Sequence, residues 1–360
     1  MRITFLIGNG FDLNLGLKTG YKDFYKYYTE KAPESDFSKS IQSNYELWAD
    51  LELGLGNYLE NVTESSLDDF LSAKEEMENL LIEYLKNEEQ RFQISDPKVL
   101  STDFQKKIKN MYTEFDATNQ NLYNQLVLSS SEQIDFSFIT FNYTNTLDKI
   151  IECVSKNCTP FHTHIHNSNT KTDIISAPLH IHGTLDDREM ILGINDVSQI
   201  NNDALRNNVD LADYIVKTNV NRGLGQGKID KAKGMINESR YLCLFGLSIG
   251  DTDSYWWAYI IDWLLKDQNR HLVIFVNSKT TVQSAQQTIR FQKRHKRNFF
   301  KKTTKEINEA IMNQIIIIPN SRIFTFSGIA VEKQKHENHP KALFPVKIEV
   351  DEEKETLVVS

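Results

Sequence analysis

The chain opens with an apolar, β-branched run that ends abruptly in glycine, and this opening constrains the fold more than any other stretch. Residues 2–7 read Arg-Ile-Thr-Phe-Leu-Ile, which predicts a buried strand. Gly8-Asn9-Gly10 follows directly, and both residue types tolerate positive φ. Such a turn can direct backbone N–H groups at a phosphate, but a strand-to-helix turn can also need glycine for backbone reasons alone. The next glycine, Gly16, comes later than in the usual dinucleotide fingerprint.

Similar units of strand, turn and helix recur later in the chain. Apolar runs at 134–141, 241–245 and 271–276 end in small or amide residues, and helical patterns follow them. Strands that alternate with helices predict an α/β fold, with a parallel or mixed sheet covered by helices on both faces. Ligands bind beyond the carboxyl ends of such strands. At these ends the chain places Gly8-Asn9-Gly10, Asn142, Gly246-Leu247-Ser248 and Asn277.

The segment between the first two strands reads as helical. Residues 19–130 carry leucines and aromatic residues at helical spacing, separated by polar stretches such as 32–44. We therefore expect three parts. Residues 1–18 and 131–330 form the sheet domain, residues 19–130 form an inserted helical subdomain, and residues 331–360 form a charged tail with two β-like runs that could pair as a hairpin.

Histidines are concentrated in two short predicted strands. Five of the nine lie at 161–166 and 178–183, and we expect these strands to pair as a hairpin with His162, His164 and His166 on one face. A metal could bind there, but no carboxylate or cysteine at ligand spacing supports one. A polar strand face or an active-site wall is the preferred interpretation, and we expect no metal.

Several local expectations complete the secondary structure. Short strands are predicted at 190–196 and 323–326, and Thr144 is a candidate N-cap for the helix that follows Asn142. The glycine-rich break at 223–227 has no strand before it, so it favours a lid or hinge over a phosphate-binding loop.

Composition limits the partners and the compartment. The 360 residues carry a formal net charge of −8, which argues against bulk binding to nucleic acid or membranes. A basic run from Arg290 to Lys302 is either a solvated helix face or a local contact with nucleic acid or phosphate. Cys153, Cys158 and Cys243 form neither a disulfide framework nor a C-x-x-C pair. We expect a cytoplasmic protein without a signal peptide or a membrane-spanning helix.

The opening residues also carry a family resemblance. They resemble the first motif of the bacteriophage abortive infection AbiH family, which is similar in turn to sirtuin-like NAD-binding proteins. Further short motifs resemble those of sirtuin-like NAD hydrolases, in the same order along the chain. The stretches that carry the resemblance are Gly8-Asn9-Gly10-Phe11-Asp12-Leu13 with Gly16 to Phe24, Thr140-Phe141-Asn142-Tyr143, His182-Gly183, Gly246-Leu247-Ser248-Ile249-Gly250-Asp251, and Asn277.

The resemblance implies a Rossmann-like, sirtuin-like domain that hydrolyses NAD to nicotinamide and ADP-ribose as an antiphage effector. It implies that Asn142 orients the ribose and a water, and that His182 acts as the general base. The remaining implied NAD-binding residues are Gly8, Asn9, Gly10, Phe11, Asp12, Gly246, Ser248, Asp251 and Asn277.

The chain also departs from the sirtuin pattern. Asp12 stands where sirtuins usually have serine, and Thr144 replaces a common aspartate. The paired C-x-x-C zinc module of protein deacylases is absent, which argues against deacylation.

Two other functions stay open at this point. The chain could bind NAD or ADP-ribose as a sensor without cleaving it, or it could act on nucleic acid through the basic run. Its expected partners are NAD or a related nucleotide and a phage-derived or co-encoded trigger protein, with a second copy of the chain as a further candidate. No membrane partner is expected.

Overall fold

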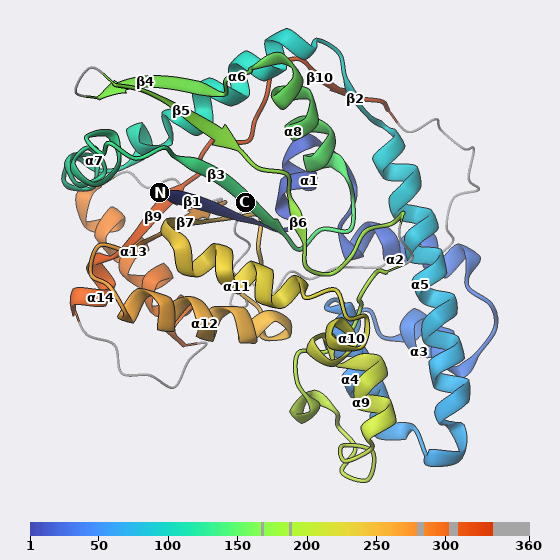
Figure 1. The fold of residues 1–360 in the computed structure, drawn as a ribbon. Coiled ribbons are helices and arrows are strands. Elements are labelled where there is room, and N and C mark those ends of the chain that lie inside the picture. The colour runs from blue at the N-terminus through green and yellow to red at the C-terminus, as the bar shows by residue number, and fades with distance from the viewer. Residues whose placement is uncertain (167–168, 187–188, 279–283, 302–308, 334–360) are drawn as a thin grey trace.

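A mixed, mostly parallel sheet of eight strands forms the centre of the molecule (Figure 1). The computed structural model describes residues 1–166, 169–186, 189–278, 284–301 and 309–333. The α/β fold expected from the alternating pattern is confirmed. The strands of the sheet are β1 (Arg2–Ile7), β3 (Asp135–Thr140), β4 (His162–His166), β5 (Asn169–Ile175), β6 (Leu179–His180), β7 (Ser239–Phe245), β8 (His271–Val276) and β9 (Ile315–Pro319).

The strand order brings several carboxyl ends to one edge. The sheet runs β4-β5-β3-β1-β7-β8-β9, and β6 pairs with β3. Central β1 is parallel to both neighbours, so that Ile7 lies opposite Thr140 and Phe245. The order extends one way from β1 through β3 and the other way from β7. A sheet whose order reverses in this way binds ligands outside the carboxyl ends of its strands, near the reversal.

Helices cover both faces of the sheet. One face shares its hydrophobic core with α1, α6 and α8, and the other shares its core with α11, α12 and α13. The helices are α1 (Gly10–Leu15), α2 (Tyr21–Lys31), α3 (Asp36–Ser43), α4 (Leu51–Tyr58), α5 (Leu67–Gln90), α6 (Pro97–Lys109), α7 (Ala117–Tyr123), α8 (Thr146–Asn157), α9 (Val209–Ile215), α10 (Lys217–Gly223), α11 (Lys228–Glu238), α12 (Ser254–Leu265), α13 (Ala285–Phe300) and α14 (Glu309–Asn313). None of the described helices is long and apolar enough to cross a membrane.

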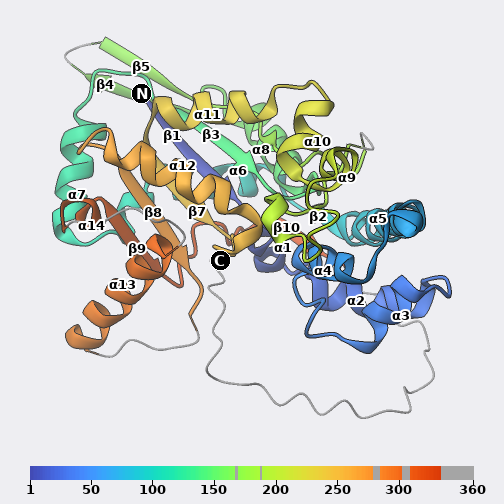
Figure 2. The same ribbon diagram turned by 90° about the horizontal axis from the view of Figure 1, so that it is seen from below.

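Residues 19–130 contribute to two different cores. Helices α2–α5 pack with α9 in a core of their own, which we call the helical module. In Figure 2 this module lies on the opposite side of the molecule from α13 and α14. By contrast, α6 and Tyr123 of α7 pack into the core of the sheet. A second, two-stranded antiparallel sheet joins β2 (Phe92–Ile94) to β10 (Ile329–Val331). Residues 334–360, where a tail hairpin was expected, lie outside the described part of the chain.

The expected histidine hairpin is wrong in its pairing. Strand β4 pairs antiparallel with β5, and β6 pairs in parallel with β3 instead. Residues 170–175 read Thr-Lys-Thr-Asp-Ile-Ile, a β-branched run that the sequence interpretation left in a turn. Because β5 follows β4 closely, their pairing closes a shorter loop than a pairing of β4 with β6 would.

Three other segments also differ from expectation. Residues 323–326 form no strand, because Phe324 and Phe326 are buried as aromatic contacts of the sheet core instead. In the 190–196 segment only Ile194 makes a β-bridge, to Val216. The polar stretch 32–44 contains α3, whose Phe37 and Ile41 are buried in the helical module.

Candidate active site

The two glycine turns at the carboxyl ends of β1 and β7 pack tightly against each other. The backbone N–H of Gly8 donates to Phe245 O at 2.9 Å, that of Gly10 to Gly246 O at 2.8 Å, and that of Phe11 to Gly8 O at 2.9 Å. A Cβ added to Gly10 would lie 2.5 Å from Gly246 Cα. These three N–H groups already have acceptors within the chain, so the corner as it stands does not present them to a phosphate.

The side chains of this corner also bond within the chain. Phe11 is fully buried and meets Phe324 edge-on, with ring centroids 5.4 Å apart. The Asn9 amide donates to Thr19 O at 3.0 Å and accepts from the Thr19 hydroxyl at 2.5 Å. Both side chains therefore stabilise the start of the chain in this structure.

Asp12, Asn142 and Thr144 form a buried group that we call the Asp12 cluster. The Thr144 hydroxyl donates to Asp12 Oδ2 at 2.6 Å. The N-cap role expected for Thr144 is wrong, because α8 begins at Thr146 after Asn145. Asp12 Oδ1 and Asn142 Oδ1 are both buried, and neither has a hydrogen-bond partner among the described residues. Burial raises the pKa of Asp12 to about 7, against the opposing effects of Thr144 and the adjacent Asn142.

His180 fixes the backbone on which Asn142 stands. Its Nδ1 lies 3.0 Å from Asn142 O and its Nε2 lies 2.8 Å from Asp148 Oδ2 on α8. The ring is buried. His180 of β6 therefore connects the residues that follow β3 to α8.

His182 lies in a different environment from Asn142. Strands β3 and β6 are parallel, with Thr140 opposite His180, so both candidate residues follow neighbouring strand ends. The Asn142 side chain, however, lies beside Asp12 of α1. The His182 ring meets Phe141 edge-on at 5.4 Å, and Phe141 packs in the core of the opposite face. Burial, reinforced by Lys217, lowers the pKa of His182 to about 3, so its imidazole is neutral at pH 7.

Next to His182, one lysine bridges two carboxylates in a group that we call the Lys217 bridge. Lys217 Nζ donates to Glu52 Oε2 at 2.8 Å and to Asp253 Oδ1 at 2.9 Å. Asp253 Oδ1 also lies 3.7 Å from His182 Nε2. Burial raises the pKa of Glu52 to about 7. At Asp253, Lys217 outweighs the effect of burial and holds the pKa below its usual value. The bridge connects α4 of the helical module to α10 and to the short 3-10 turn Asp251–Asp253 before α12.

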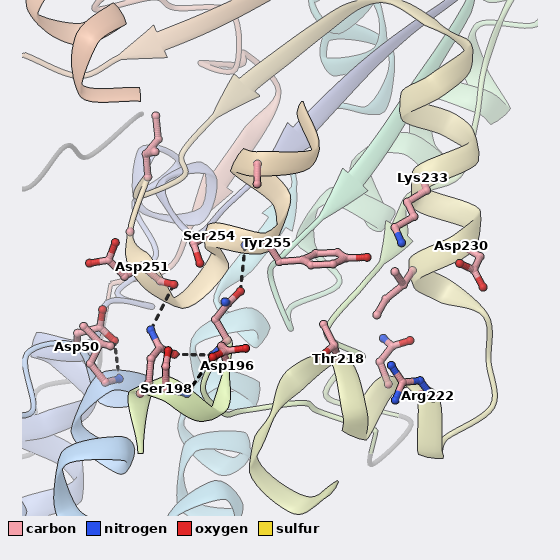
Figure 3. Close-up of a pocket in the computed structure, with 18 of the residues that line it drawn as sticks. Asp50, Asp196, Ser198, Thr218, Arg222, Asp230, Lys233, Asp251, Ser254 and Tyr255 are labelled. Carbon is pink, nitrogen blue, oxygen red and sulfur yellow. Dashed lines mark hydrogen bonds between the residues drawn. The ribbon is translucent and has the colours of Figure 1, made fainter. Parts of the chain in front are cut away.

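A cleft of about 1480 Å³, lined by several charged side chains, opens beside this bridge (Figure 3). It lies among α4, residues 195–199, α10, α11, the turn after β7, and α12. Its acidic lining residues are Asp50, Asp196, Asp230 and Asp251, and its cationic ones are Arg222, Lys233 and Lys301. In Figure 3, Asp50, Asp251 and Ser254 lie toward one end, and Arg222 and Lys233 lie toward the other, together with the acidic Asp230. One end of the cleft thus carries carboxylates, and the other carries both cations and a carboxylate.

The sequence-predicted residues are distributed unevenly around this cleft. Asp251 lines it, as do Gly225 and Gly227 from the predicted hinge. Gly8, Gly10 and Gly246 lie in the closed corner, and Ser248 and Asn277 are exposed outside the lining. Asn142 and His182 are buried and are not among the lining residues. His182 is connected to the cleft only indirectly. Its ring lies next to Asp253, and Ser254, the residue after Asp253, lines the cleft.

The sequence interpretation missed Asp50, Glu52, Lys217 and Asp253. Only Asp253 had a local signal, because it lies two residues after the Gly246-to-Asp251 motif. Among the described residues, no group of three or more His, Cys, Asp or Glu side chains could hold a metal. The side chains of His164 and His166 lie outside the described residues.

Comparison with known proteins identifies the family. The family model described as "Bacteriophage abortive infection AbiH" matches residues 4–277, a span that includes the glycine corner, both buried clusters and Asn277. No curated protein matches the chain. Similarity to sirtuin-like proteins stays a prediction from the sequence. The chain belongs to the bacteriophage abortive infection AbiH family, and this membership indicates a role in abortive infection defence against phage.

Proposed function

We propose that this AbiH protein hydrolyses NAD to nicotinamide and ADP-ribose in the cleft, and that the resulting loss of NAD stops phage growth in the infected cell. The observation that carries this proposal is the position of the cleft and the distribution of charge along it. It lies beyond the carboxyl end of β7 and is large enough for a dinucleotide. Clefts at this edge of an α/β sheet are the usual ligand sites.

The charged lining residues fit two neighbouring parts of NAD, its diphosphate and its nicotinamide ribose. Arg222 and Lys233 would neutralise the diphosphate, since cationic side chains bind phosphate through charge-assisted hydrogen bonds. Asp50 and Asp251 would face the nicotinamide ribose, which becomes positively charged as nicotinamide leaves. Carboxylates placed where positive charge develops stabilise such a transition state.

The strand order supports a dinucleotide ligand as well. Taking the parallel strands in chain order, the sheet extends to one side of β1 through β3 and β6, and to the other through β7, β8 and β9. This is the order of doubly wound dinucleotide-binding sheets, and it agrees with the Rossmann-like and sirtuin-like resemblance of the sequence motifs.

The proposed reaction breaks the bond between ribose C1′ and the nicotinamide nitrogen, and the electron pair leaves with nicotinamide. A water oxygen then bonds to C1′ and gives its proton to a base. Among the carboxylates that line the cleft, Asp50 is the proposed proton acceptor. Burial raises the pKa of its carboxyl, which makes it a better base. The sequence assigned this role to His182 and the ribose contact to Asn142. Both lie behind the cleft wall, and a pKa of about 3 makes His182 a weak proton acceptor.

Nicotinamide release from NAD by the purified full chain, measured with and without a phage lysate, tests the proposal. The lysate provides a phage-derived trigger, and a co-encoded protein is a second trigger to add. We expect Asp50→Asn to lower the rate by about 100-fold or more, while Asp210→Asn, an exposed acid on α9, leaves it unchanged. The Asn142→Ala and His182→Ala variants are assayed in the same way, at a temperature where each is as fully folded as the wild-type chain. If only these two lose activity, the chemistry belongs to the buried residues. If the wild-type chain releases no nicotinamide under any condition, NAD hydrolysis is excluded.

A nucleotide sensor without turnover is the second candidate. The described residues that line the cleft include no histidine, and the glycine corner has its N–H groups occupied. The first observation favours binding without cleavage, and the second places such binding in the cleft and not at the glycine corner. A rise in thermal stability with NAD or ADP-ribose, without nicotinamide release, would establish this function instead.

A further inference from the structure

The exposed face of α13 concentrates positive charge in a chain that is acidic overall. Residues 285–301 include six Lys or Arg residues and one histidine, but no Asp or Glu. The chain as a whole has a formal net charge of −8. Phe291, His295 and Phe299 turn the other face of the helix into the core. The cations therefore lie on the side directed away from the sheet.

These cations line a groove and are not scattered over the surface. The groove measures about 410 Å³, and its lining consists of Arg290, Lys293, Arg294, Arg297, Asn298 and Lys301. These side chains lie at the molecular surface, and the lining contains no carboxylate among the described residues. A solvated helix face usually mixes charges of both signs, so this composition favours an anionic ligand.

The groove also continues toward the cleft. Asn298 and Lys301 belong to the lining of both. Arg290 and Lys301 are eleven residues apart along the helix, which corresponds to about 16 Å. A small anion would contact one or two of these cations, whereas a chain of phosphates could contact all of them.

We propose that the basic groove of α13 binds the phosphate backbone of nucleic acid, independently of sequence. Guanidinium groups match phosphate geometry, and three of the five cations are arginines. The aromatic residues of α13 are buried, so the groove provides no aromatic stacking surface for bases among the described residues, and contacts with the phosphate backbone dominate. Its exposed face has a single large apolar residue, Ile289, which disfavours insertion into a membrane interface. This proposal is independent of NAD hydrolysis.

Fluorescence anisotropy of labelled single-stranded DNA, single-stranded RNA and duplex DNA, titrated with the full chain at several salt concentrations, tests the proposal. We expect affinity to fall steeply with salt, because each phosphate contact releases counterions. The triple variant Arg290→Glu, Lys293→Glu and Arg297→Glu should lose on the order of 100-fold in affinity, and its log–log salt slope should be shallower by about 3.

The control makes the same charge change elsewhere. Lys22→Glu, Lys26→Glu and Lys106→Glu alter exposed lysines of α2 and α6 and should leave binding nearly intact. An equal loss in both variants would assign the effect to net charge and overturn the proposal. Absent or salt-independent binding would also overturn it, as would binding to anionic phospholipid vesicles in place of nucleic acid. The three altered α13 residues lie outside the cleft lining, so nicotinamide release in the same variants reports separately on the proposed enzyme.

Discussion

The Lys217 bridge and the Asp12 cluster are two buried polar groups that differ in whether a lysine bonds to the buried carboxylates. Lys217 places one positive charge between Glu52 and Asp253 and donates a hydrogen bond to each of them. Asp12 Oδ2 accepts a hydrogen bond from the Thr144 hydroxyl, and Asp12 Oδ1 has no partner among the described residues. The pKa of Asp253 is lowered, while that of Asp12 is raised to about 7. At Glu52 burial outweighs the effect of Lys217 and raises the pKa to about 7 as well. The bridge thus stabilises the charge of Asp253, whereas burial destabilises the charged forms of Glu52 and Asp12.

Removing the shared cation should give the largest effect. Lys217→Met leaves Glu52 and Asp253 buried without a counter-charge, and we expect a loss of about 3–5 kcal/mol in the free energy of unfolding. Urea denaturation at pH 8 measures it. The control Lys228→Met removes the partly exposed pair with Glu189 and should change stability by less than about 1 kcal/mol. Equal losses in the two variants would remove the distinction between buried bridge and surface pair.

The opposite sign is expected at Asp12. Its pKa rises from the ordinary aspartate value of 3.8 to about 7 in the folded chain, so its contribution to stability is present below pH 3.8 and is lost as the pH rises through 7. Asp12→Asn removes that loss, because the amide of Asn carries no charge to bury. We expect the variant to be more stable than wild type by about 2–4 kcal/mol at pH 8 and by little at pH 4. Denaturation at the two pH values tests this, and a gain that does not depend on pH would contradict it.

Thr144→Val should give the smallest effect. The substitution keeps the shape of the side chain but removes the donor to Asp12 Oδ2. We expect a loss of about 1–2 kcal/mol at pH 8, because a buried acceptor is left without its hydrogen bond. The loss should shrink in the Asp12→Asn background if the two residues act as a pair, and a double-mutant cycle measures that coupling. Fully additive losses would show that Thr144 acts apart from Asp12.

Much of the sheet could be predicted from local pattern. The runs that became β1, β3, β7, β8 and β9 are apolar and β-branched enough to be strands wherever they are placed. The buried side of α12 followed from its spacing, since Trp256, Trp257 and Ile260 are all in the core. The β4–β5 pair was missed because residues 170–175 are too polar to stand out, and 323–326 was misassigned because its aromatic residues pack without joining a ladder.

The candidate site was less predictable because it is assembled from distant segments. Glu52 and Lys217 are 165 residues apart, and each lies in a segment that reads as an ordinary helix. Nothing local to either residue indicates that it is buried. Asp251 was found because it ends a recognisable turn, whereas the occupied N–H groups of Gly8 and Gly10 depend on β7, which no local motif could reveal.

The interlocked turns after β1 and β7 have a consequence for how such glycine signatures are used. A side chain at Gly8, Gly10 or Gly246 would collide with the backbone of the facing turn, whether or not any nucleotide is bound. Selection on folding alone would then preserve all three glycines. In this chain the glycine signature therefore reports how two turns pack together, and it does not by itself identify a ligand.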